Sequence, residues 1–132
     1  MLAKVIKKER LMNSILIFSF LYAAFNVIGA SIIKNKLLLE NVYTFKEFIL
    51  FLMDFKIVLA LGLIFISMFF SVKALSLDKF SLVIPILTGV NFLTTIAVGY
   101  LFFKDKLDFS GYIGILFILI GIYLLGWGRQ VA

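Results

Sequence analysis

The polar residues at the middle of the apolar runs of this sequence are uncharged, and Lys73 lies about one turn from the end of its run. The chain has no histidine and no cysteine, so the commonest metal ligands and the usual general base near neutral pH are absent. What remains are asparagines, serines, threonines and tyrosines, which donate and accept hydrogen bonds. We therefore expect these residues to contact a polar ligand or one another, and we predict no cofactor, no metal and no enzymatic activity.

Three of the apolar runs carry such polar residues at helical spacing. In the first run, Ser19, Tyr22, Asn26 and Gly29 follow one another at steps of three, four and three residues, which places them on one helix face. The second and third runs repeat the pattern, and together the stripes predict one polar pathway. The residues assigned to this pathway are Tyr22, Asn26, Ser67, Ser71, Thr88, Asn91 and Thr95.

A simpler interpretation is that these side chains only join helices to each other. Such hydrogen bonds in membranes each contribute well under about 2 kcal/mol, and for a single Ser or Thr we favour this interpretation. Asparagine is costlier to bury in lipid, so for Asn26 and Asn91 helix packing and substrate contact both stay open.

The elements that must position these residues are membrane-spanning helices. The 132 residues are 64% hydrophobic with a mean hydropathy of +1.17, which leaves too little polar surface for a water-soluble globule. We predict an all-α, integral membrane four-helix bundle in one domain, residues 1–132. Each predicted span is long enough to cross about 30 Å of hydrocarbon. The spans cover residues 11–33, 57–77, 80–103 and 109–127.

Between the first two spans, residues 41–56 carry Phe45, Phe48 and Ile49 at helical spacing among charged residues. This pattern indicates an amphipathic helix at the membrane interface or an N-terminal extension of the second span. In the last span, Gly114, Gly121 and Gly128 recur every seven residues and leave a smooth groove. That groove favours a dimer seam over packing within the chain.

The charged residues lie between or beside the spans. Basic residues cluster before the first span, so we predict that both termini are cytoplasmic, although the overall bias is small and opposite or dual insertion stays open. The basic residues form no recognition motif for nucleic acid. Tyr100, Asp105 and Asp108 near the third loop are the remaining candidates for acid or base groups, but we interpret residues 104–108 with Lys104, Asp105, Lys106 and Asp108 as a solvated turn.

Several motifs together resemble the four-helix members of the drug/metabolite transporter superfamily over nearly the whole chain. They are Phe80 to Gly89 with Pro85, Phe102 to Phe109 with its charged turn, and the glycine-spaced last span. Asn26 to Gly29 with Lys34 also resembles the small multidrug resistance signature. There, the residue matching Asn26 is a glutamate that binds protons and cationic drugs. Asparagine cannot titrate, so proton-coupled export does not carry over. The resemblance implies a dimeric bundle of the small multidrug resistance type.

The longer first loop is similar to that of the EamA-like subgroup, which includes the aminoarabinose-lipid flippase subunits. This resemblance implies a flippase for a polyprenyl-phosphate-linked sugar in the bacterial inner membrane, working as a homodimer or as a heterodimer with a related subunit. Lys73 and Lys79 would then meet the phosphate at the cytoplasmic mouth. The alternatives are a small-molecule or cationic drug exporter and a non-transporting accessory subunit.

Overall fold

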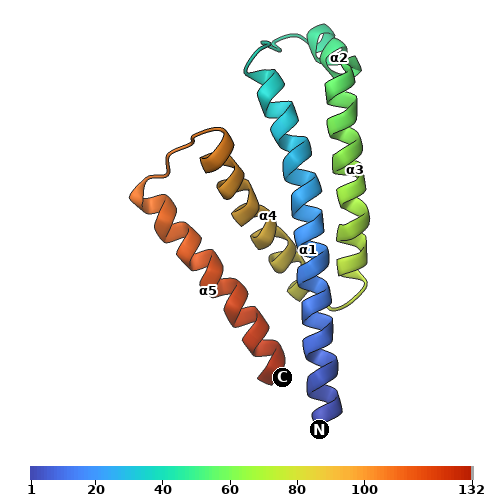
Figure 1. Cartoon of the computed structure of the whole chain (residues 1–132), viewed down its shortest axis with the longest axis vertical. Coiled ribbons are helices and arrows are strands. Elements are labelled where there is room, and N and C mark those ends of the chain that lie inside the picture. The colour runs from blue at the N-terminus through green and yellow to red at the C-terminus, as the bar shows by residue number, and fades with distance from the viewer. Residues whose placement is uncertain (132) are drawn as a thin grey trace.

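The computed structural model describes the backbone of residues 1–131 and the side chains of residues 1–128. This part of the chain is all-helical, as predicted, and four of its five helices are long and apolar enough to cross a membrane (Figure 1). The fold therefore indicates a multi-pass membrane protein. The helices are α1 (Leu2–Leu37), α2 (Phe45–Met53), α3 (Phe55–Leu75), α4 (Phe80–Phe102) and α5 (Phe109–Val131).

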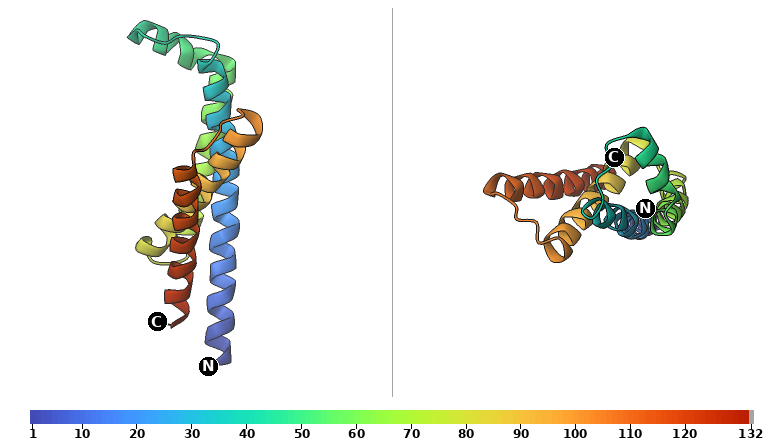
Figure 2. Two further views of the ribbon diagram at one scale, coloured as in Figure 1. Left: turned by 90° about the vertical axis from the view of Figure 1, so that its left-hand side faces the viewer. Right: turned by 90° about the horizontal axis from the view of Figure 1, so that it is seen from above.

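Helices α1 and α3 form the most extensive packing in the molecule. They run side by side, α4 crosses α1 obliquely, and α5 packs mainly on α4 at the edge of the bundle (Figures 1 and 2). Both chain ends and the loop between α3 and α4 lie at the same end. A buried apolar cluster joins α1, α3 and α4 there. Its members are Ile15, Ala23, Ala74, Val83, Ile86, Leu87 and Val90.

Helix α1 begins at Leu2, well before the predicted start at residue 11. The basic segment ahead of the apolar run contains mainly good helix formers and no glycine or proline, so the helix continues through it. Its 36 residues extend about 54 Å at 1.5 Å per residue, against about 30 Å of hydrocarbon. Part of α1 therefore projects beyond the membrane core.

Helix α2 is separated from α3 by a break at Asp54. Residues 45–53 are therefore not a continuous N-terminal extension of α3. Its start is stabilised by a capping box, in which Thr44 Oγ1 accepts the N–H of Glu47 and the Glu47 carboxylate accepts the N–H of Thr44. At its end Asp54 is extended, with φ −64° and ψ 135°, and its Oδ1 caps α3 by accepting the Lys56 N–H at 2.9 Å. The break turns α2 across the long helices (Figure 2).

Candidate substrate pathway

The two asparagines of the predicted pathway meet between α1 and α4. Asn26 Nδ2 donates a hydrogen bond of 3.0 Å to Asn91 Oδ1, although the residues are 65 positions apart. Both side chains are half-buried. Among the described residues, no other side-chain hydrogen bond involves either amide, so Asn26 Oδ1 and Asn91 Nδ2 keep their capacity to bond a ligand.

The other predicted residues on α1 and α3 lie in packed surroundings. Ser67 is buried, and its hydroxyl donates to Ile64 O of its own helix at 2.6 Å. Tyr22 is half-buried against the apolar cluster, and Ser71 is half-buried on α3. Ser67 therefore bonds within its own helix, and Tyr22 packs against the cluster that joins α1, α3 and α4.

The predicted stripe on α4 does not face the other two stripes as a unit. Thr88 and Thr95 are exposed, and their hydroxyls donate to Ile84 O and Asn91 O at 2.7 and 2.8 Å. Of these three side chains, only that of Asn91 hydrogen-bonds to α1. Because α4 crosses α1 obliquely (Figure 1), the residues of one polar stripe on α4 do not all face α1.

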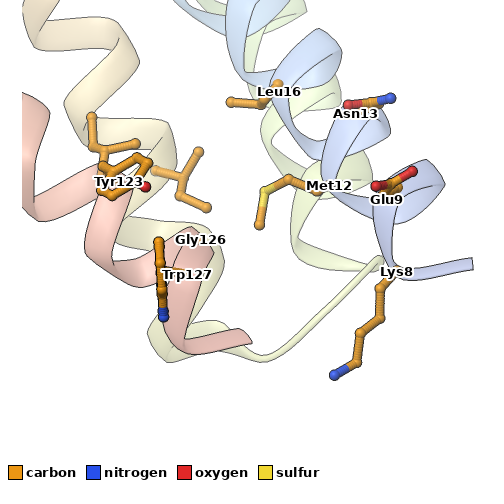
Figure 3. A pocket seen from close by; sticks show the side chains of 10 residues that line it. Lys8, Glu9, Met12, Asn13, Leu16, Tyr123, Gly126 and Trp127 are labelled. Atoms are coloured by element: carbon orange, nitrogen blue, oxygen red, sulfur yellow. The ribbon is translucent and has the colours of Figure 1, made fainter. Parts of the chain in front are cut away.

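Two lateral cavities border α1 near its opposite ends. Toward the chain termini, a cavity of about 480 Å³ lies between α1 and α5, where Met12 and Leu16 extend from α1 toward α5 (Figure 3). Tyr123 and Trp127 line it from α5, with their ring centroids 5.9 Å apart. A second cavity, of about 570 Å³, is bordered by Ser31, Asn35 and other α1 residues, and by Val98, Phe102 and Phe103.

Several polar residues of these cavities were not among the predicted site residues. Asn13 lines the first cavity, and Ser31 and Asn35 line the second. These residues are difficult to recognise as cavity residues in the sequence. Asn13 and Asn35 lie close to charged residues at the span ends and are expected to be solvated. The packing of α1 against α4 and α5 is what makes them part of a cavity.

The end of the bundle opposite the chain termini is held by ion pairs. Lys34 Nζ lies 3.6 Å from Asp105 Oδ2 and 4.9 Å from the centre of the Phe103 ring. Lys36 pairs with Asp54 and, at 3.4 Å, with Glu40. These contacts join α1 to the α4–α5 loop and to the α2–α3 junction.

The two lysines predicted to meet a phosphate lie near the α3–α4 loop, at the end of the bundle where the chain termini are. Lys73 is exposed, with its Nζ 5.6 Å from the centre of the Phe69 ring, and Lys79 is exposed at the start of α4. A cationic end of this kind suits an anionic headgroup.

The three glycines of the predicted dimer seam are open. A Cβ atom added to Gly114, Gly121 or Gly128 would meet no described atom within 4 Å. Gly89 on α4 behaves differently, because its Cβ would collide with Ile122 of α5. The contact between α4 and α5 therefore uses Gly89, and Gly121 lines a cavity between these two helices.

Comparison of the chain with models of known protein families, with curated proteins and with solved structures gave no match. The class that its fold defines is a multi-pass α-helical membrane protein.

Proposed function

We propose that this protein is a membrane transporter, and specifically a flippase for a polyprenyl-phosphate-linked sugar, that works as a dimer. One observation carries the proposal: an uncharged pair of amides, Asn26 and Asn91, hydrogen-bonded between two spans. Eleven residues of α4 lie on either side of Asn91, which places this pair at the middle of a span. Polar groups at this depth are expensive and mark pathways more often than surfaces.

The chemistry of the pair fits a sugar. An amide both donates and accepts hydrogen bonds, as a sugar hydroxyl does, and it carries no charge that would need a counter-ion. Asn26 Oδ1 and Asn91 Nδ2 supply one free acceptor and one free donor at neighbouring positions. The lipid tail of such a substrate would stay in the bilayer, which the open lateral cavities beside α1 allow.

One end of the bundle carries lysines suited to a phosphate. Lys73 and Lys79 lie with the basic start of α1 at the end that holds the chain termini. At the other end Lys34 and Lys36 are occupied by carboxylates. We place the phosphate at the end of the chain termini because the resemblance assigns it to Lys73 and Lys79, and we propose that this end is cytoplasmic.

The test is transport in liposomes with asparagine variants. The purified protein is reconstituted, and the movement of a fluorescent polyprenyl-phosphate sugar to the opposite leaflet is measured for wild type, for Asn26→Leu, for Asn91→Leu and for the double variant. Each single variant leaves one amide unpaired and is expected to lose about 1–2 kcal/mol of stability. The double variant leaves no unpaired amide and should recover most of that stability while remaining inactive.

Thr94→Val is the matched control, because Thr94 is not among the predicted pathway residues and its hydroxyl donates to Val90 O of its own helix. It should transport at the wild-type rate. A double leucine variant that transports normally would contradict the proposed role of the amides. If the wild-type protein, reconstituted without any other protein, moved no substrate, the proposal of a flippase that works by itself would be contradicted.

An accessory, non-transporting subunit is the second candidate, and one observation favours it. The hydroxyls of Ser67, Thr88 and Thr95 all donate to the backbone of their own helices. This is the behaviour of residues that are tolerated in a span rather than of residues that bind a ligand. Under this alternative the double leucine variant would be as functional as the wild type.

A further inference from the structure

Helix α2 has an apolar face that nothing in the described part of the chain covers. Phe45, Phe48 and Ile49 lie on this face at helical spacing and are 78, 46 and 44% exposed. On another side of the helix Phe51 is buried, whereas Leu50 and Met53 are 59 and 74% exposed. Asp54 at the end of the helix contacts Lys36. The orientation of α2 about its own axis is therefore determined by contacts with the bundle.

The length of α3 determines the level at which α2 lies. Its 21 residues extend about 31 Å, so the whole helix is needed to cross about 30 Å of hydrocarbon. Its first residue, Phe55, must then lie at the boundary of the membrane. Only Asp54 separates α3 from α2, and α2 turns across the bundle (Figure 2). Helix α2 therefore lies at this boundary and along the membrane plane.

Contacts with α1 hold α2 in this orientation. Lys36, whose side chain is only 13% exposed, pairs with both Asp54 and Glu40, and so joins the end of α1 to the α2–α3 junction. The capping box of Thr44 and Glu47 holds the other end of α2 in helical form. The helix is thus supported at both ends while its apolar face stays open.

We propose that α2 is an in-plane membrane anchor whose binding partner is the phospholipid interface at the Lys34–Asp105 end of the bundle. Its apolar face enters the boundary between headgroups and acyl chains, about 5–10 Å deep as for other interfacial helices. Asp54, at the end of the helix, stays with Lys36 of the bundle. This inference goes beyond the proposed function, since it depends on the spans and not on any substrate.

The absence of cysteine makes the test direct, because single cysteines are labelled without background. A nitroxide is attached to Phe48→Cys, Ile49→Cys or Lys46→Cys in protein reconstituted in phosphatidylcholine/phosphatidylglycerol vesicles. Contact of each label with oxygen, which is soluble in lipid, and with a water-soluble nickel chelate is then measured by electron paramagnetic resonance. Phe65→Cys at the middle of α3 and Asn41→Cys in the first loop provide the lipid and water references.

In an in-plane anchor, labels at Phe48→Cys and Ile49→Cys contact oxygen more than nickel, at a depth between those of the two references. The label at Lys46→Cys contacts nickel more. Equal nickel contact at all three positions would place α2 in water and overturn the proposal. Shielding of the Phe48→Cys label from both reagents would also overturn it, since the face would then be covered by protein.

Discussion

Asp54 connects two helices, α1 and α3, through one carboxylate. It accepts the backbone N–H of Lys56 at the start of α3, and it pairs with Lys36 at the end of α1. The Lys36 ammonium, followed by the Lys56 N–H, holds the pKa of Asp54 below its ordinary value of 3.8. The backbone N–H groups of Tyr43 and Thr44 likewise lower the pKa of Glu47 below 4.5.

We predict that acid weakens the junction through Asp54. A carboxyl whose pKa is depressed by folding stabilises the folded state above its unfolded pKa, and the effect is lost as the pH falls through the lower, folded pKa. Thermal unfolding in detergent should therefore show constant stability from pH 7 to about 5 and a decline below about 4. Asp54→Asn should be less stable than wild type at pH 7 and should show a smaller decline.

Glu47→Gln is the matched control for that measurement. Glu47 titrates in a neighbouring pH range but belongs to the capping box of α2, and glutamine preserves a capping acceptor. As the pH falls, Glu47→Gln should still lose the stability that depends on Asp54. If Asp54→Asn and wild type declined equally, the Lys36–Asp54 pair would not be the cause.

At the scale of elements, the α1–α3 interface depends on one glycine. A Cβ atom at Gly29 would lie 2.7 Å from the backbone oxygen of Ala60 and 2.7 Å from Ile64 Cγ1. A backbone oxygen cannot rotate away as a side chain can. The close approach of these two helices therefore requires the absence of a side chain at this position.

Gly29→Ala is expected to separate the two helices and to cost about 1–3 kcal/mol of stability, the usual cost of overpacking. Gly62→Ala on α3 is the matched control, because a Cβ there meets no described atom within 4 Å. The control should be neutral or stabilising by about 0.5–1 kcal/mol through helix propensity. Denaturant unfolding followed by circular dichroism measures both changes, and an equal effect of the two substitutions would contradict the packing argument.

At the scale of the whole molecule, the four spans leave a thin and incomplete enclosure. Helix α5 packs mainly on α4, and its described residues between Phe109 and Gly128 include none that is buried. Gly114, Gly121 and Gly128 are open along it. A transporter built from this chain therefore needs a second subunit to complete its wall, and the glycines of α5 are the surface proposed for it.

Gly114→Leu is predicted to weaken self-association at least tenfold, equivalent to about 1.4 kcal/mol, because the side chain would block close approach of a second helix. Energy transfer between labelled copies at increasing lipid dilution measures the association. Gly62→Leu, at an equally open glycine on α3, should leave it unchanged. A wild-type chain that is monomeric at all dilutions would contradict a homodimer.

The number of helices long and apolar enough to span a membrane, and the approximate ends of all but the first, followed from the sequence, as did the amphipathic segment before α3. Hydrophobic runs of this length have to be helical in lipid, since every backbone hydrogen bond must be made within the segment. Thr44 and Glu47 have the spacing of a capping box, a signal that was not among the predictions. These features depend on residues close together in the chain, where composition and period are sufficient.

The relations between helices were decided only by the tertiary structure. Asn26 meets Asn91, whereas Thr88 and Thr95 of the same predicted stripe lie outside, because the crossing of α4 over α1 selects which part of its face makes contact. The break between α2 and α3 at Asp54 is stabilised by Lys36, which belongs to α1. Helical period determines which residues share a face, but crossing angle and rotation, which depend on side-chain packing along the whole interface, determine what that face meets.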